Sequence, residues 1–125
     1  MSYIDYTTKI LDIKNTNLNG ILDLTNYTNL EELYCQNNNI SEIIGLKHTQ
    51  LKILDISNNN IGIICLLSEK LRILNAYNCK LTKILCKFPL NLKKLDLFSN
   101  SLSSVPDFPD SLEWVDLSSN DLLYL

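Results

Sequence analysis

The segment LKILDISNNNI, residues 51–61, carries the pattern that predicts the fold. Its spacing is L-x-x-L-x-L-x-x-N-x-L, with Asn59 at the asparagine position. The apolar positions are Leu51, Leu54, Ile56 and Ile61. Apolar residues alternate around ILDI, which indicates a short β-strand with one buried face. The asparagines that follow favour a turn. Because one such strand is not stable alone, we expect copies of it beside it.

The same spacing occurs six times in the chain. The repeats begin near residues 8, 30, 51, 71, 92 and 112, so they are 20 to 22 residues long. Thr8 is the one polar residue at their five apolar positions. The fifth of these positions, expected to point inward, holds Ile21, Ile43, Ile64, Ile84, Val105 and Leu125. The asparagine position holds Thr16, Asn38, Asn59, Cys79, Asn100 and Asn120. A repeat of this length predicts a solenoid.

These repeats resemble the leucine-rich repeat family, and the resemblance covers residues 8–125. It implies an α/β-type right-handed solenoid with a six-stranded parallel sheet on its concave side. It also implies a ladder of asparagine side chains that satisfy backbone groups in the turns. We expect this ladder to be interrupted at Thr16 and Cys79.

The segments that connect the repeats are short. Six to eight residues lie between the fifth apolar position and the next repeat, so we expect a mostly extended or 3-10 convex side with little α-helix. The first repeat is the longest, and residues 20–33 have room for a helical turn. Residues 105–112, VPDFPDSL, resemble the convex segment of short repeats in secreted bacterial effectors. Similar short repeats occur in giant DNA viruses.

The repeats organise residues 1–125 as a single domain. The net charge of −3 argues against a general affinity for nucleic acid or an anionic membrane surface. The chain has no apolar run of membrane-spanning length, and MSYIDYTTK lacks the features of a signal peptide. We therefore expect a cytoplasmic protein, in the host cytoplasm if it is viral or an effector. Its four cysteines are expected to be free thiols.

The two ends of the solenoid are expected to differ. Residues 1–7, with Tyr3, Ile4 and Tyr6, form a partial cap over the first coil. The C-terminal end has no predicted cap, which exposes Leu117, Leu122 and Leu125. These residues predict self-association, as a homodimer through this end. Fraying of the last coil, or a longer parent chain, would explain the same pattern.

Residues between the inward leucines should point to the concave face and form three columns. The first column is Ile10, Glu32, Ile53, Ile73, Lys94 and Trp114. The second column is Asp12, Tyr34, Asp55, Asn75, Asp96 and Asp116. The third column is Lys14, Gln36, Ser57, Tyr77, Phe98 and Ser118. Neighbours in a column are expected to lie one strand apart.

Repeats 3 to 6 place apolar and aromatic side chains on this face, bordered by charges. The predicted partner-binding residues are Tyr34, Ile53, Asp55, Ile73, Tyr77, Lys94, Asp96, Phe98, Trp114 and Asp116. Such a surface is typical of protein binding. Alternatively, β-branched and aromatic residues simply suit strands, and pairs such as Tyr77 with Phe98 stabilise the sheet.

Catalysis and metal binding have less support. The second-column aspartates could serve acid–base chemistry or bind a cation, but the family resemblance implies solvated concave residues. Cys65 and Cys86 should lie on adjacent coils, where a disulfide or half of a zinc site is conceivable. Small buried residues in tight turns explain them more simply. His48 lies a coil away, so we predict no catalytic residue, metal or cofactor.

The sequence therefore predicts a non-enzymatic protein–protein interaction module that binds a partner protein on its concave face. The alternative is a structural scaffold unit that self-associates through the C-terminal end or the apolar concave surface. Neither hypothesis involves a small-molecule substrate, a nucleic acid or a membrane.

Overall fold

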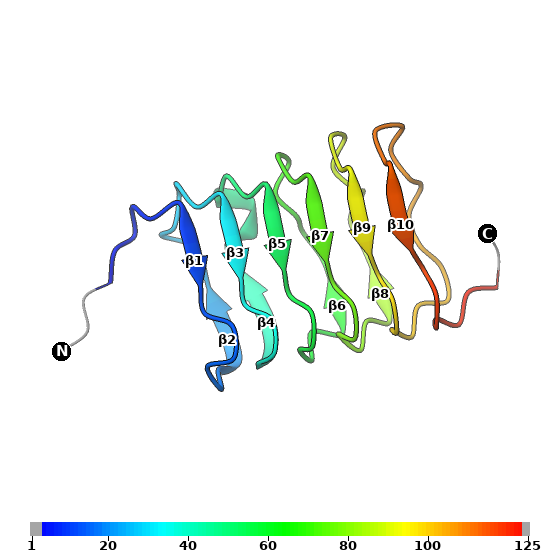
Figure 1. Cartoon of the computed structure of the whole chain (residues 1–125), viewed down its shortest axis with the longest axis horizontal. Coiled ribbons are helices and arrows are strands. Elements are labelled where there is room, and N and C mark those ends of the chain that lie inside the picture. Colours follow the sequence, from blue (N-terminus) through cyan, green and yellow to red (C-terminus); the bar gives the residue numbers. More distant parts are fainter. Residues whose placement is uncertain (1–3, 124–125) are drawn as a thin grey trace.

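A computed structural model describes residues 4–123. Six short strands form one parallel sheet, in which each strand pairs with the strand of the next repeat (Figure 1). These strands are β1 (Ile10–Asp12), β3 (Glu32–Tyr34), β5 (Ile53–Asp55), β7 (Ile73–Asn75), β9 (Lys94–Asp96) and β10 (Trp114–Asp116). The predicted solenoid and its six-stranded parallel sheet are confirmed. We number the coils 1 to 6 by the repeats and call the side of this sheet turned away from the core the concave face.

The convex side contains two separate pairs of parallel strands. β2 (Asn19–Asp23) pairs with β4 (Asn39–Ile44), and β6 (Ile63–Ile64) pairs with β8 (Lys83–Ile84). A single 3-10 helix, η1 (Leu46–His48), is the one helix in the described part of the chain. The expectation of a mostly extended convex side is confirmed. Residues 20–33 contain no helix: β2 ends at Asp23, and two isolated turns follow, closed by the bonds from the Tyr27 N–H to the Leu24 carbonyl and from the Leu30 N–H to the Tyr27 carbonyl.

The core is a stack of inward leucines between the concave and convex sides. The first two apolar positions of the middle coils are fully or almost fully buried: Leu30, Leu33, Leu51, Leu54, Leu71, Leu74, Leu92 and Leu95. Each coil therefore buries its apolar side chains mainly against the coils before and after it, as a solenoid requires.

Ile21 departs from the expected inward position and is 62% exposed. The register between β2 and β4 shifts just before it, so Ile21 pairs with Glu42. Leu22 then pairs with Ile43 and packs against the core in its place. The prediction for Ile21 is wrong because β2 alternates without a bulge, so Gly20 and Leu22 turn inward and Ile21 turns outward. In β4 the extra residue Ser41 turns Ile43 inward instead.

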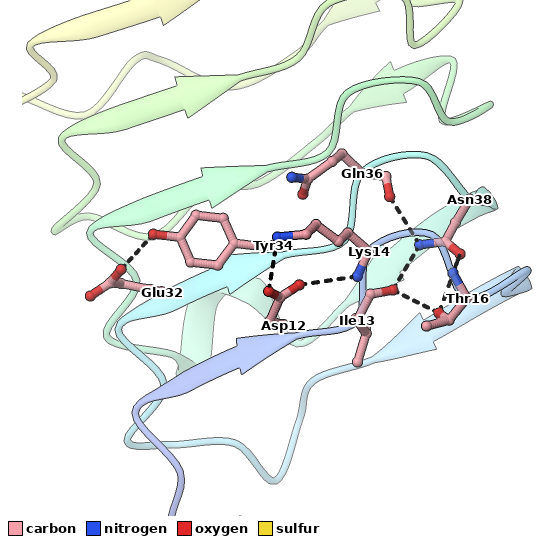
Figure 2. Close-up of polar contacts among 8 residues, drawn as sticks. All are labelled: Asp12, Ile13, Lys14, Thr16, Glu32, Tyr34, Gln36 and Asn38. Carbon is pink, nitrogen blue, oxygen red and sulfur yellow. Dashed lines mark hydrogen bonds and ion pairs between the residues drawn. The ribbon is translucent and has the colours of Figure 1, made fainter.

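The predicted asparagine ladder is present, and Asn38 shows its geometry (Figure 2). The Nδ2 of Asn38 donates to the carbonyl oxygens of Ile13 and Cys35, both at 3.0 Å. Its Oδ1 accepts from the backbone N–H groups of Thr16 at 3.1 Å and Leu18 at 2.9 Å. Comparable bonds to the preceding coil are made by Asn59, Asn100 and Asn120. These side chains satisfy turn backbone groups that would otherwise be unpaired.

At Cys79 the ladder is modified and the turn is kept. The thiol donates to the carbonyl oxygen of Ile56 at 2.9 Å, which replaces the amide donor. A thiol is a poor acceptor, and the backbone carbonyl of Cys79 instead accepts from the N–H groups of Ile61 and Gly62. Thr16 keeps a donor as well, because its Oγ1 bonds to the carbonyl of Ile13 at 2.7 Å. The expected interruption at Cys79 is therefore partial: the side chain still donates a hydrogen bond, but it does not accept one as an asparagine Oδ1 does.

At the N-terminal end, Tyr6 packs edge-on against Tyr27 of coil 1, with ring centroids 5.0 Å apart. Tyr3 lies outside the described residues, so the partial cap over residues 1–7 stays a prediction. Across residues 4–123, none of the helical structure is long and apolar enough to cross a membrane.

Candidate functional site

The first two concave columns have the register that the sequence predicts. The inward residue Leu54 pairs with Leu33 on one side and Leu74 on the other. The first and second concave columns run along the two sides of this row of leucines. Ile53 pairs with Ile73 in the first column. Lys94 pairs with Trp114 there, and the Lys94 Nζ lies 5.0 Å from the centroid of a Trp114 ring. This distance permits a cation–π interaction across the two strands.

Aromatic side chains at the C-terminal half of this face are accessible. Phe98 is 37% exposed and Trp114 is 46% exposed. Within residues 4–123, aromatic rings pair between Tyr6 and Tyr27 and between Phe88 and Phe108. Tyr77 and Phe98 do not form such a ring pair. The alternative that they stabilise the sheet as cross-strand neighbours stays a prediction.

Ser57 is a third-column residue that does not face solvent. It is fully buried, and its Oγ accepts from the N–H of Tyr77 at 3.2 Å. The alternation that directs side chains outward applies within a strand, and β5 ends at Asp55. The expectation of an outward Ser57 is wrong because the chain already turns at this residue.

The second-column aspartates end their strands. Each carboxylate accepts from the backbone N–H two residues later, at 2.8 to 3.3 Å. The residues are Asp12, Asp55, Asp96 and Asp116. This is the Asx-turn geometry that aspartate favours. Hydrogen bonds from Ser118 lower the pKa of Asp116, so it is ionised at neutral pH. The aspartates combine a turn-forming role with a negative border for the concave face.

Apart from the exposed Ile10, the concave face of coils 1 and 2 is polar, and several of its side chains bind one another (Figure 2). The Lys14 Nζ lies 3.1 Å from the Asp12 carboxylate. The Tyr34 hydroxyl donates to the Glu32 carboxylate at 2.5 Å, which raises the pKa of Tyr34 to about 12. The Oε1 of Gln36 is buried without a hydrogen-bond donor. This half differs from the apolar half formed by later coils.

A fourth column of side chains, all charged, also follows the repeat and was not among the predicted columns. The residue that immediately precedes each concave strand is charged in all six coils: Lys9, Glu31, Lys52, Arg72, Lys93 and Glu113. We call this the strand-start column. Glu31 lies 3.1 Å from the Lys52 Nζ and 3.9 Å from the Lys9 Nζ. The signal in the sequence that identifies this column is a charged residue directly after the first position of every repeat.

The four cysteines lie within the described residues and are free. Burial raises the pKa of Cys35 and of Cys79 to about 12, so both thiols stay protonated. Cys86 is half-buried, and burial also raises its pKa. Cys65 is exposed, which makes the expectation of a buried residue wrong for this position. In the part of the chain that the structure covers, no group of three or more potential His, Cys, Asp or Glu ligands could hold a metal ion.

The C-terminal coil is less buried than the others. Val115 occupies an inward position and is 39% exposed, while Leu117 and Leu122 are partly buried. Among the described strands, β10 pairs with β9 on one side only. Leu125, the third predicted self-association residue, lies outside the described residues.

The stacked coils, the single parallel sheet and the asparagine ladder define a repeat solenoid whose side chains between the leucines face solvent. The comparisons place it in a family. A family model described as "Leucine Rich repeats (2 copies)" matches residues 28–69, and one described as "Leucine Rich Repeat" matches residues 91–110. The chain is a leucine-rich repeat protein.

Two plant proteins are similar to most of the chain. "Serine/threonine-protein kinase BRI1-like 1" of Arabidopsis thaliana is 34% identical over 132 residues, covering 90% of this chain and 11% of that protein. "Receptor-like protein kinase BRI1-like 3" of the same organism is 30% identical over 133 residues, with the same coverage. The chain thus spans about a tenth of the length of these relatives. No solved structure matches it. Leucine-rich repeat domains generally mediate protein–protein interaction, and the fold is typically not catalytic.

Proposed function

We propose that this protein binds a partner protein through the concave face of coils 3 to 6. The observation that carries this proposal is the exposure of Phe98 and Trp114, at 37% and 46%, on a sheet face with no covering segment in the described residues. Trp114 is held on β10, and Phe98 lies two residues after the end of β9, where its N–H is fixed by Asp96. Aromatic side chains on a fixed backbone lose little conformational entropy on binding and often dominate an interface.

The charges around these aromatics support a specific interface. Lys94 lies over Trp114 and leaves its charge available to an acidic partner group. Asp96 and Asp116 use one carboxylate oxygen to end their strands, so the other oxygen can accept from the partner. An apolar centre with a charged border resembles the organisation of known protein interfaces.

A capture experiment tests the proposal. The full chain is immobilised, and proteins retained from a cell extract are compared between wild type, Phe98→Ala and Trp114→Ala. Each substitution is expected to weaken binding of the main retained protein by about 2 kcal/mol, roughly 30-fold, with little effect on folding stability. The matched control is Phe108→Ala, because Phe108 has a similar exposure of 41% but lies on the convex side.

Two results would contradict concave-face binding. One is unchanged affinity in both concave variants. The other is an equal loss in Phe108→Ala, which would place the contact on the convex side.

We also infer a second candidate function, self-association through the C-terminal end. Val115, Leu117 and Leu122 support it, because the last coil exposes part of the apolar surface that neighbouring coils bury elsewhere. Pairing of two such ends would cover this surface and the free edge of β10.

Light scattering over a wide concentration range tests this second function. A mass that rises toward a dimer supports it, and Leu122→Lys should then restore the monomer. Leu90→Lys is the control, because Leu90 is 83% exposed on another coil. A wild-type protein that stays monomeric at several hundred micromolar would contradict self-association.

We propose a cytoplasmic location for the protein. The free cysteines support it, because exposed thiols such as Cys65 persist in a reducing compartment. Fractionation of cells that express the tagged chain would check this location.

A further inference from the structure

The convex side of the solenoid has a break between coils 2 and 3. The β2–β4 pair and the β6–β8 pair belong to separate sheets, and the described residues include no pairing of β4 with β6. On the opposite side, β3 and β5 of the same two coils are paired in regular register. The two coils are therefore joined at the concave sheet and at Ile40, whose carbonyl accepts from the Asn60 N–H at 3.0 Å, and they separate beyond Ile40 along β4.

The conformation of coil 2 explains this break. The Leu24 N–H donates to the Ile44 carbonyl at 2.8 Å, which ties the end of β4 to coil 1. Gly45 follows with a φ of 85°, and a Cβ at this position would collide with the backbone of Thr25. Only glycine permits so close an approach. Coil 2 is thus packed toward coil 1 at this corner, which leaves space on its coil 3 side.

A pocket of about 240 Å³ lies at this break. Part of its lining belongs to the core, since Leu54, Ile56 and Ile64 are buried. At its opening, Ile44 is 39% exposed and Ile63 is 44% exposed. The lining residues are aliphatic apart from Glu42, Gly45 and Cys65. Protein interiors are normally close-packed, so a pocket of this size is a notable departure.

We propose that this pocket binds a small, uncharged, apolar molecule of one or two rings. A cavity of about 150 Å³ lined by aliphatic and aromatic side chains stays dry and accepts benzene, and drug-sized pockets begin near 300 Å³. A volume of about 240 Å³ therefore fits a ligand between these sizes. The aliphatic lining offers a charged ligand no partner, since Glu42 is the one ionisable carboxylate there. This site is separate from the concave face and does not depend on its proposed function.

Binding of 1-aminonaphthalene, a two-ring aromatic probe that is uncharged at neutral pH and whose fluorescence shifts to shorter wavelength in apolar surroundings, tests the proposal with the full chain. We expect saturable binding of one probe per chain. Ile44→Trp places a larger side chain at the opening and should weaken binding at least tenfold. Ile21→Trp is the matched control, because Ile21 is an exposed isoleucine of the neighbouring strand β2 and does not line the pocket. It should bind the probe as wild type does.

Alkylation of Cys65 provides a second test, which uses the wild-type protein and so does not depend on the folding of a variant. Cys65 lines the pocket and is exposed, so iodoacetamide should modify it, and saturating probe should slow that modification severalfold. Mass spectrometry distinguishes Cys65 from Cys86. Absence of saturable binding, unchanged affinity in Ile44→Trp, or an unchanged alkylation rate at Cys65 would each overturn the proposal. Probe bound at the concave face or the C-terminal coil would give the last two results.

Discussion

At the scale of single residues, the asparagines of the ladder contribute more than their polarity suggests. Asn59 is buried, and its side chain bonds the carbonyls of Cys35 and Ile56 and the N–H of Ile40. These groups belong to two coils, so one side chain fastens two turns together. Removing it would leave buried backbone groups without partners, which is costly in an apolar interior.

We therefore expect Asn59→Ala to lower the free energy of unfolding by about 2 to 4 kcal/mol, since two or three buried groups lose their partners. Urea denaturation measures this change. Asn60→Ala is the matched control, because the neighbouring Asn60 is exposed and its side chain makes none of these bonds. The control should change stability by less than about 0.5 kcal/mol. Equal effects of the two substitutions would contradict the role assigned to the ladder.

At the scale of the strand, four of the six concave strands end at an aspartate whose carboxylate accepts a hydrogen bond from the following turn. Asp12 also bonds the Lys14 side chain, and hydrogen bonds from that side chain and from the Lys14 N–H lower the pKa of Asp12 from its ordinary value of 3.8. Because the pKa of Asp12 is lower in the folded state, its ionised carboxylate stabilises the fold above about pH 3.8. This contribution is lost as the pH falls through the lower folded value.

This assignment predicts a pKa for Asp12 below 3.8 in the folded protein, measured by NMR titration of its carboxyl carbon. Lys14→Gln should move the pKa of Asp12 upward, toward the ordinary value. Lys9→Gln removes the same charge but lies next to Glu31, so it should have a smaller effect on Asp12. If the two lysine variants shift the pKa of Asp12 equally, the local hydrogen bond is not the main cause.

Much of the strand-level structure follows from the sequence because the leucine spacing repeats with little change. The pairing of Ile53 with Ile73 and the ladder position of Asn38 both follow from that period. The exposed position of Ile21 does not, because coil 1 lacks the extra strand residue that β4 has at Ser41, and the leucine spacing is the same in both coils. The buried Ser57 and the pocket beside Gly45 also result from local turns. The outward position of Phe98 and Trp114 was predictable, whereas the repeat pattern does not specify a partner.

At the scale of the whole molecule, position along the solenoid determines how much a repeat residue contributes. Leu11 and Leu54 occupy the same position in coils 1 and 3. Leu54 has a coil on each side and is 1% exposed, whereas Leu11 is only partly buried. Because each coil contacts mainly its neighbours, an end coil has fewer apolar partners.

Leu54→Ala is expected to cost about 2 to 5 kcal/mol of unfolding free energy, and Leu11→Ala should cost clearly less. Urea denaturation of the two variants under the same conditions compares one chemical change at two places in the stack. Equal losses would show that coil 1 is as well covered as coil 3.

The strand-start column has a consequence for how such a protein can change by duplication or loss of repeats. Glu31 lies between Lys9 and Lys52, while Arg72 lies between Lys52 and Lys93. Loss of coil 2 would preserve the leucine stack and bring Lys9 beside Lys52, two like charges. A second copy of coil 2 inserted after coil 4 would instead separate Arg72 from Lys93 with a carboxylate. The coils share one shape, yet their order is not neutral, because it decides whether the strand-start charges of adjacent coils attract, as in coils 1 to 3, or repel, as in coils 3 to 5.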